Sequence, residues 1–139
     1  MVTSLVLDVS TTLSFLLKDE FSPYAMRALA TLRTASFVVV PTHFWIEVSN
    51  ALLMAERRNR ASSAEIARAF HLVFGLHVST DDETARRCQF ETLSLARQYK
   101  LTMYDAAYLE LAMRHGATLA TIDKDLVRAA NATRIKLLS

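Results

Sequence analysis

Ser4-Leu5-Val6-Leu7-Asp8-Val9 is an apolar run that lacks the alternation of polar and apolar residues expected of a half-exposed strand. A strand with this composition is covered on both faces, which is typical of parallel sheets packed between helices. Two further runs have the same character, at 36–40 and at 118–122. The run at 36–40 is rich in β-branched valines, and Pro41 ends it. The N-terminal run therefore predicts a central strand of a parallel sheet.

Helical patterns separate these runs. We expect a helix capped by Ser10, Thr11 or Thr12, and a second helix opened by Ser22-Pro23. Further helices are expected at about 42–58, 62–74, 83–99, 104–115 and from 123 onward, with short additional strands at 76–78 and 135–138. Strands that alternate with helices predict an α/β fold in which helices cover both faces of a parallel sheet.

The composition limits the possible classes of protein. A chain of 139 residues fits one domain, so we expect residues 1–139 to fold as a unit. Although 52% of the residues are hydrophobic, no run approaches the roughly 18 apolar residues of a membrane span. We expect no secretory leader, and the single Cys88 fits a reducing cytoplasm. The net charge of +2 is too small to indicate nucleic-acid binding by itself.

Four carboxylates fall where a parallel sheet forms its sites, beyond the carboxyl ends of the strands. Asp8 ends the first strand and Asp123 ends the strand at 118–122. Glu47 lies in the second turn of the helix that follows the 36–40 strand. Asp105 opens a helix that is apolar almost all round and must be largely buried. We therefore expect these four side chains to converge.

Converging carboxylates favour a metal site. Their charges repel, and at least one would take up a proton unless a cation neutralised the group. No Lys or Arg is adjacent in sequence to Asp8, Glu47 or Asp105, although Lys124 follows Asp123. Oxygen ligands suit Mg²⁺ or Mn²⁺, and these ions suit the hydrolysis of phosphodiester bonds.

Each of these residues also has a simpler interpretation. Asp105 and Asp123 could cap their helices, and Glu47 could be a surface glutamate. Asp125 offers a second carboxylate near Asp123. The histidines lack metal-ligand spacing, and we assign surface or capping roles to them: His43, His71, His77 and His115. Cys88 lies on an apolar stripe and is assigned to the core.

Four segments of the sequence resemble the motifs of PIN domains. They are Val6-Leu7-Asp8-Val9-Ser10, Pro41 followed by Glu47-Val48-Ser49-Asn50-Ala51-Leu52, Tyr104-Asp105-Ala106-Ala107-Tyr108-Leu109-Glu110-Leu111-Ala112, and Leu119-Ala120-Thr121-Ile122-Asp123-Lys124-Asp125-Leu126. Their order and spacing cover practically the whole chain, and its length is similar to that of the VapC-type toxins of toxin–antitoxin modules. Val9 stands where the family commonly has alanine.

The resemblance implies a three-layer α/β/α sandwich with a parallel sheet of strand order 3-2-1-4-5. It also implies Mg²⁺- or Mn²⁺-dependent cleavage of structured RNA such as tRNA or rRNA. By position, Asp8, Glu47, Asp105 and Asp123 match the catalytic and metal-binding quartet of the family. The supporting polar positions correspond to Ser10, Asn50 and Thr121. Toxins of this kind form homodimers and are inhibited by a cognate antitoxin protein, so the resemblance implies both partners.

Two other functions compete with a nuclease. A PIN-like domain could serve only as a catalytically inert binding or assembly module, although such a module would have no reason to keep four costly carboxylates. A receiver-type phosphotransfer domain also has an acidic pocket on a parallel sheet. It needs a Lys at the end of the last strand, and the 135–138 strand leaves no room for that arrangement.

Overall fold

The computed structural model describes residues 2–139 and shows strands and helices in alternation. The elements are β1 (Ser4–Leu7), α1 (Val9–Leu16), the 3-10 helix η1 (Lys18–Glu20), α2 (Pro23–Thr34), β2 (Phe37–Val40), α3 (Phe44–Arg57), α4 (Ser63–Phe74), β3 (Ser79–Thr80), α5 (Thr84–Arg87), the π helix η2 (Cys88–Thr92), α6 (Leu93–Tyr99), α7 (Met103–His115), β4 (Thr118–Ala120) and α8 (Lys124–Ala132).

The sheet is parallel and has the strand order β3-β2-β1-β4. Val6 of β1 lies opposite Val39 of β2 on one side and Leu119 of β4 on the other. A single parallel bridge joins Leu119 of β4 to Leu137, which lies outside the named strands. The order 3-2-1-4 agrees with the expected topology, and the last expected strand is reduced to that single bridge.

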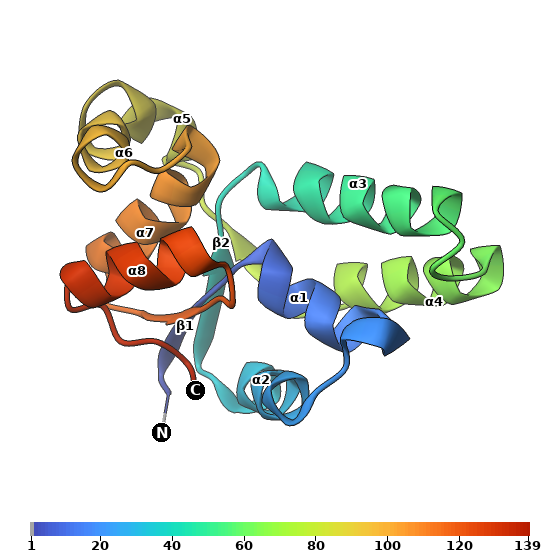
Figure 1. Ribbon diagram of the computed structural model, residues 1–139. Coiled ribbons are helices and arrows are strands. Elements are labelled where there is room, and N and C mark those ends of the chain that lie inside the picture. Colours follow the sequence, from blue (N-terminus) through green and yellow to red (C-terminus); the bar gives the residue numbers. More distant parts are fainter. Residues whose placement is uncertain (1) are drawn as a thin grey trace.

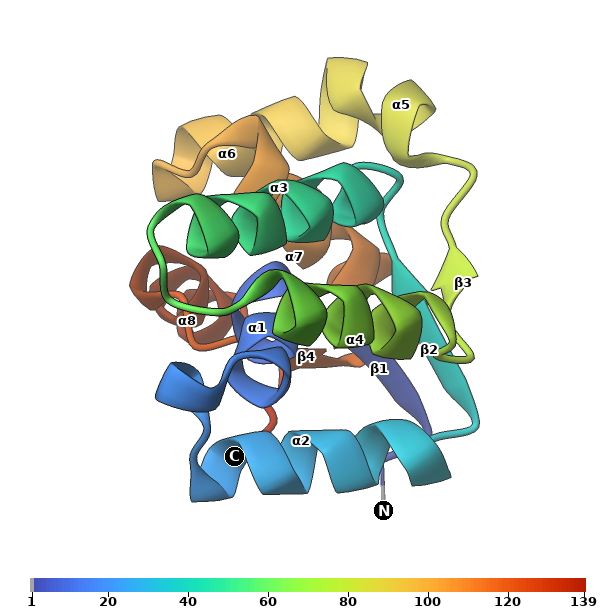
Figure 2. The same cartoon turned by 90° about the vertical axis from the view of Figure 1, so that its right-hand side faces the viewer.

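Helices cover both faces of the sheet. Figure 1 shows α1, α2 and α4 on one side of the central strands and α7 and α8 on the other. Figure 2 views the same arrangement from the side of α3 and α4. Because the strands are parallel, their carboxyl ends meet at one edge, where α1, α3 and α8 begin. The expected α/β class with two helical layers is confirmed.

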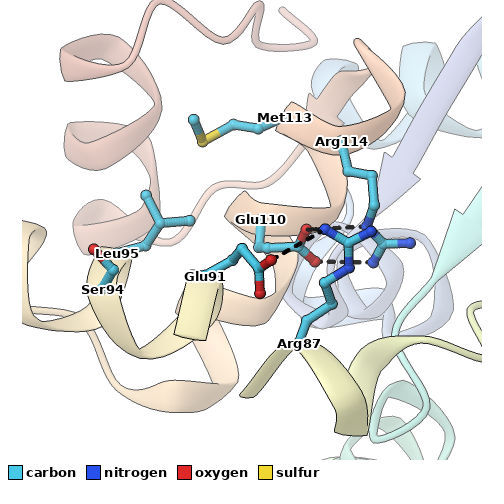
Figure 3. A pocket seen from close by; sticks show the side chains of 7 residues that line it. All are labelled: Arg87, Glu91, Ser94, Leu95, Glu110, Met113 and Arg114. Atoms are coloured by element: carbon cyan, nitrogen blue, oxygen red, sulfur yellow. Dashed lines mark hydrogen bonds and ion pairs between the residues drawn. The ribbon is translucent and has the colours of Figure 1, made fainter. Parts of the chain in front are cut away.

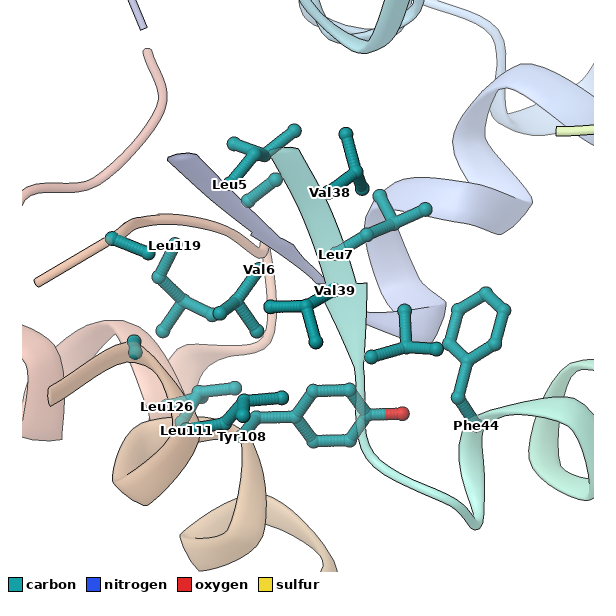
Figure 4. Close-up of a cluster of buried hydrophobic side chains, with 14 of the residues drawn as sticks. Leu5, Val6, Leu7, Val38, Val39, Phe44, Tyr108, Leu111, Leu119 and Leu126 are labelled. Atoms are coloured by element: carbon teal, nitrogen blue, oxygen red, sulfur yellow. The ribbon is translucent and has the colours of Figure 1, made fainter. Parts of the chain in front are cut away.

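The core explains why the strand sequences do not alternate. Leu5, Val6 and Leu7 are inaccessible to solvent, because one face of β1 contacts α1 and α2 while the other contacts α7. Figure 4 shows these side chains together with Tyr108 and Leu111 of α7. None of the helices within residues 2–139 has the length and hydrophobicity that crossing a bilayer requires.

Several local expectations were wrong. The third strand lies at Ser79–Thr80 rather than at 76–78, because Leu76 and Val78 pack against the core while the next two residues pair with β2. The helix expected at 83–99 is interrupted by η2, whose wider π turn separates α5 from α6. The strand at 135–138 is shortened because Arg134 turns the chain with φ 61° just before it.

Candidate active site at the carboxyl edge of the sheet

Asp8 is buried at the junction of β1 and α1, where hydrogen bonds fix both of its carboxylate oxygens. Oδ1 accepts from the backbone N–H of Val9 at 2.7 Å, which makes Asp8 the cap of α1 in place of Ser10, Thr11 or Thr12. Oδ2 accepts from the hydroxyls of Ser10 at 2.7 Å and Thr121 at 2.6 Å. Burial raises the pKa of Asp8, and these hydrogen bonds only partly offset that effect.

Ser10 and Thr121 also connect the first strand to the segment after β4. The Ser10 hydroxyl accepts from the backbone N–H of Ile122 at 3.0 Å, and the Thr121 hydroxyl accepts from that of Asp123 at 3.1 Å. The two hydroxyl oxygens are 3.3 Å apart. Residues far apart in sequence are thus held in one polar network, and this network places Asp123 beside Asp8.

Glu47 reaches the same edge from the first turn of α3, one turn earlier in the helix than expected, because α3 begins at Phe44 and not near residue 42. Its Oε1 accepts a hydrogen bond from the hydroxyl of Tyr108 at 3.0 Å, and His43 Nε2 lies 3.3 Å from that oxygen. Burial is the largest cause that raises the pKa of Glu47, and the charges of Asp8 and Asp105 add to it. Asn50 is exposed one turn further along α3 and makes no hydrogen bond to the site within residues 2–139.

Asp105 lies in the first turn of α7 and does not act as its cap. The cap is Thr102, whose hydroxyl accepts from the backbone N–H of Asp105 at 3.2 Å. The Asp105 carboxylate is therefore free for another role. Burial, followed by the charges of Asp123, Asp8 and Asp125, raises its pKa to about 6. This coupling indicates that the Asp105 carboxylate lies near the other acidic side chains.

Asp123 occupies the cap position of α8, but its side chain makes no capping hydrogen bond. Its Oδ2 is buried and has no hydrogen-bond partner. Within residues 2–139 only one other buried side-chain polar atom shares this property, Nε2 of His43, which approaches Glu47 but is not aligned as a hydrogen bond. Buried polar atoms without partners are rare in proteins. Both of these atoms belong to the acidic edge of the sheet.

No Lys or Arg in the described chain forms an ion pair with Asp8, Glu47, Asp105 or Asp123. Their oxygens are not gathered as tightly as those of Asp81, Asp82 and Glu83, which lie within 4.8 Å of one another and form the only such group in residues 2–139. The charges of neighbouring members raise the pKa of Asp8, Glu47 and Asp105. The four carboxylates therefore form a negative site that lacks compensation from the protein itself.

The tighter trio at 81–83 differs because arginines pair with two of its three carboxylates, those of Asp81 and Glu83. Arg114 donates to both oxygens of Asp81 at 2.9 and 2.8 Å and also to Glu110, while Arg86 and Arg87 pair with Glu83. Figure 3 shows Arg114, Glu110 and Arg87 beside a cavity of about 380 Å³. Arg114 holds the pKa of Asp81 down, at about 2. The arginines supply the charge that a cation would otherwise supply, so we read this trio as a structural ion-pair network.

Two residues that contact the acidic edge were missed from the sequence. His43 was assigned a surface or capping role, but it lies half-buried against Glu47 and the ring of Tyr108. Tyr108 was treated as an apolar residue of α7. Helical spacing could have revealed both, because His43 precedes Glu47 by four residues and Tyr108 follows Asp105 by three.

The raised pKa of Asp105 predicts a pH effect on stability. Its pKa is about 6 in the folded chain against an ordinary 3.8, so the folded state binds this proton more tightly and loses stability as pH rises through this interval. Without divalent cations, Asp105→Asn should be more stable than the wild-type chain at about pH 7.5, by at most about 3 kcal/mol and less where solvent screens the charge. This advantage should shrink towards about pH 4.

Urea unfolding in EDTA at both pH values measures the effect of Asp105→Asn. Asp125→Asn is the matched control, because the Asp125 side chain is 69% exposed and its pair with Arg128 is long, at 3.5 Å. An advantage of Asp105→Asn that is equal at both pH values would contradict the assigned pKa.

Residues 5–132 match the PIN domain family. No curated protein sequence gives a significant match. The fold is similar to that of PAE2754 from Pyrobaculum aerophilum, with 24% identity, a TM-score of 0.66, and coverage of 91% of this chain and 79% of that one.

Two further solved structures have the same fold. VapBC2 from Rickettsia felis, bound to a DNA fragment from its promoter, is 13% identical with a TM-score of 0.63, and 97% of each chain is covered. VapC20 from Mycobacterium tuberculosis, described as a toxin that cleaves the sarcin-ricin loop, is 14% identical with a TM-score of 0.57, and 90% of this chain and 94% of that one are covered. At such identities the likeness establishes a shared fold.

Proposed function

The chain belongs to the PIN domain family, and from this premise we propose that it is a metal-dependent RNA endonuclease acting as the toxin of a toxin–antitoxin system. The observation that carries the proposal is the group of four carboxylates, Asp8, Glu47, Asp105 and Asp123, which no Lys or Arg of residues 2–139 neutralises. In an inert binding module this uncompensated charge would destabilise the folded chain and serve no function. Residues 1–139 would act as a single nuclease domain.

The donor set fits a hard divalent cation. All four side chains offer oxygen atoms, which Mg²⁺ and Mn²⁺ prefer. Asp123 Oδ2 is buried without a partner, and the Asp105 carboxylate makes no hydrogen bond within the described residues. We propose these residues, with Asp8 and Glu47, as the ligands. A cation held there would polarise the phosphate and help generate the attacking hydroxide.

The protein's own residues would orient the site. Ser10 and Thr121 fix Asp8 Oδ2 by hydrogen bonds, and through backbone N–H groups they fix the segment that carries Asp123. The main chain is therefore ordered before any ligand arrives, which lowers the cost of binding. Asn50 is exposed on α3, and we propose that it contacts the RNA or a water beside Glu47.

Metal removal tests the proposal directly. The purified chain should cleave structured RNA, either tRNA or rRNA, when Mg²⁺ or Mn²⁺ is present. EDTA should reduce the rate by at least about 100-fold, and added Mn²⁺ should restore it. Denaturing gels with end-labelled RNA measure the rate and locate the cut. Cleavage that persists in EDTA would rule out the metal mechanism, and a folded chain that cuts no RNA under any condition would favour the binding module.

The toxin role makes further demands. Solved structures with the same fold include VapBC2 and a toxin–antitoxin complex from Klebsiella pneumoniae. On this basis we propose that an antitoxin protein inhibits this chain. We also propose a cytoplasmic location and a homodimer. Induced expression in a bacterial cell should arrest growth, and co-expression of the product of the neighbouring short reading frame should relieve the arrest. Size-exclusion chromatography with light scattering tests the dimer.

A further inference from the structure

Tyr108 has a hydroxyl that the core cannot satisfy. The residue is 1% exposed and belongs to the hydrophobic cluster between α7 and the sheet. Figure 4 shows its ring among the core side chains, with the hydroxyl pointing towards the side where Phe44 begins α3. A buried hydroxyl needs a partner. Within residues 2–139 its hydrogen-bond partner is Oε1 of Glu47, at 3.0 Å.

The geometry assigns Tyr108 as a positioning residue that fixes Glu47 for metal binding, an inference that rests on the proposed nuclease function. Asp105 and Tyr108 are three residues apart on α7 and so project from neighbouring positions on one helix face. The same helix therefore carries Asp105, one carboxylate of the acidic edge, and the Tyr108 hydroxyl, which orients a second carboxylate, Glu47 on α3. We call this hydroxyl the clamp of Glu47. The hydrogen bond occupies Oε1 and leaves Oε2 to face a cation.

Glu47 needs such a clamp because its side chain is 34% exposed. A glutamate with this freedom loses side-chain rotamer entropy when it is immobilised. The buried ring of Tyr108 cannot follow a mobile partner, so the hydrogen bond restricts Glu47 before a ligand arrives. The ring of His43, packed edge-on against Tyr108 with centroids 5.3 Å apart, limits movement on another side.

The direction of the hydrogen bond suits this role. A tyrosine hydroxyl supplies the proton and a carboxylate accepts it, so Tyr108 donates to Oε1 of Glu47. Because the buried ring fixes the position of the hydroxyl, the hydrogen bond also orients the Glu47 carboxylate.

Tyr108→Phe tests the assignment because it removes only the hydroxyl and keeps the buried ring. Mn²⁺ binding by the full chain, measured by calorimetry and by the electron paramagnetic resonance signal of free Mn²⁺, should weaken by about 10- to 100-fold. RNA cleavage should fall at low Mn²⁺ and recover at high Mn²⁺, since the ligand itself remains. Thermal unfolding checks that the variant is folded.

Tyr104→Phe is the matched control. Tyr104 is 60% exposed, and its ring also contacts His43, with centroids 5.6 Å apart, but no hydrogen bond joins it to Glu47. Its Mn²⁺ affinity should stay within about twofold of the wild-type value. In a Glu47→Gln background, Tyr108→Phe should weaken Mn²⁺ binding no further, because its effect passes through Glu47.

The possible outcomes distinguish the positioning role of Tyr108 from the proposed nuclease function. Wild-type Mn²⁺ affinity in a folded Tyr108→Phe variant would overturn the positioning role and leave the nuclease proposal standing. An equal loss in Tyr104→Phe, or an undiminished loss in the Glu47→Gln background, would also overturn it. A wild-type chain that binds no Mn²⁺ would overturn both the metal site and the clamp.

Discussion

Replacing Asp8 with asparagine is expected to lower the rate of RNA cleavage by at least about 100-fold without unfolding the protein. Asp8 is the most buried of the four acidic residues, and its two oxygens are oriented by Val9, Ser10 and Thr121. Asparagine has nearly the same shape but lacks the charge that holds a divalent cation. Changes in residues that merely support a metal ligand cost about 10- to 100-fold, so loss of a ligand should cost at least as much.

The same variant should be at least as stable as the wild-type chain in EDTA. Burial raises the pKa of Asp8, which means that its ionised form is unfavourable in the folded state. Asparagine retains an oxygen that can cap α1. Activity and stability are therefore expected to move in opposite directions, as is common where a site is built from strained or uncompensated groups.

Single-turnover cleavage and urea unfolding measure the two effects of Asp8→Asn. Asp125→Asn is the control, since it removes a carboxylate near the site that is largely exposed, and it should retain near-wild-type activity. This control also decides between the two carboxylates after β4. Full activity in Asp8→Asn, or an equal loss in Asp125→Asn, would contradict the assignment of the quartet.

The fold follows from the sequence because the central strands are apolar on both faces. Leu5, Val6 and Leu7 have no polar residue between them, and only a strand covered on both faces tolerates this. β3 was misplaced because Ser79 and Thr80 are polar and exposed, so the hydrogen-bond ladder alone defines that strand. Hydrophobic periodicity reports which residues are buried, and it does not report which backbone groups pair.

The acidic quartet was predictable for a related reason. A carboxylate at the end of an apolar strand has few structural uses, and sheet topology brings such ends together. The roles of Tyr108 and His43 were harder to foresee, because an aromatic residue on a buried helix is ordinarily a core residue. Only the distance from the Tyr108 hydroxyl to Glu47, across 61 positions of sequence, distinguishes a clamp from simple packing. Contacts of this range are set by tertiary structure.

A second substitution with a large expected effect is Arg114→Ala, which should lower the free energy of unfolding. The guanidinium of Arg114 is 14% exposed and pairs with two carboxylates that are nearly inaccessible, Asp81 and Glu110. Arg114→Ala would leave Asp81 without an ion-pair partner and Glu110 with only its 3.9 Å ion pair to Arg87. Breaking a buried pair in this way costs about 3–5 kcal/mol, which is a large part of the stability of a domain of this size. Urea unfolding at about pH 7 should show this loss.

Arg86→Ala is the matched control for Arg114→Ala. Arg86 pairs with Glu83, but its side chain is 74% exposed, so its loss should cost no more than about 1 kcal/mol. The cost of Arg114→Ala should also depend on pH. Asp81 has a pKa of about 2 in the folded chain against an ordinary 3.8, so its pairing stabilises fully above the higher value and is lost as pH falls through the lower one.

The difference between wild type and Arg114→Ala should therefore shrink as the pH approaches about 2, where protonation neutralises Asp81. A cost no larger than that of Arg86→Ala would show that the arginines do not neutralise the 81–83 trio. That result would return the trio to consideration as a cation site, because its oxygens lie within 4.8 Å of one another. A large and acid-sensitive cost would instead leave the carboxyl edge, with its four uncompensated carboxylates, as the proposed cation site.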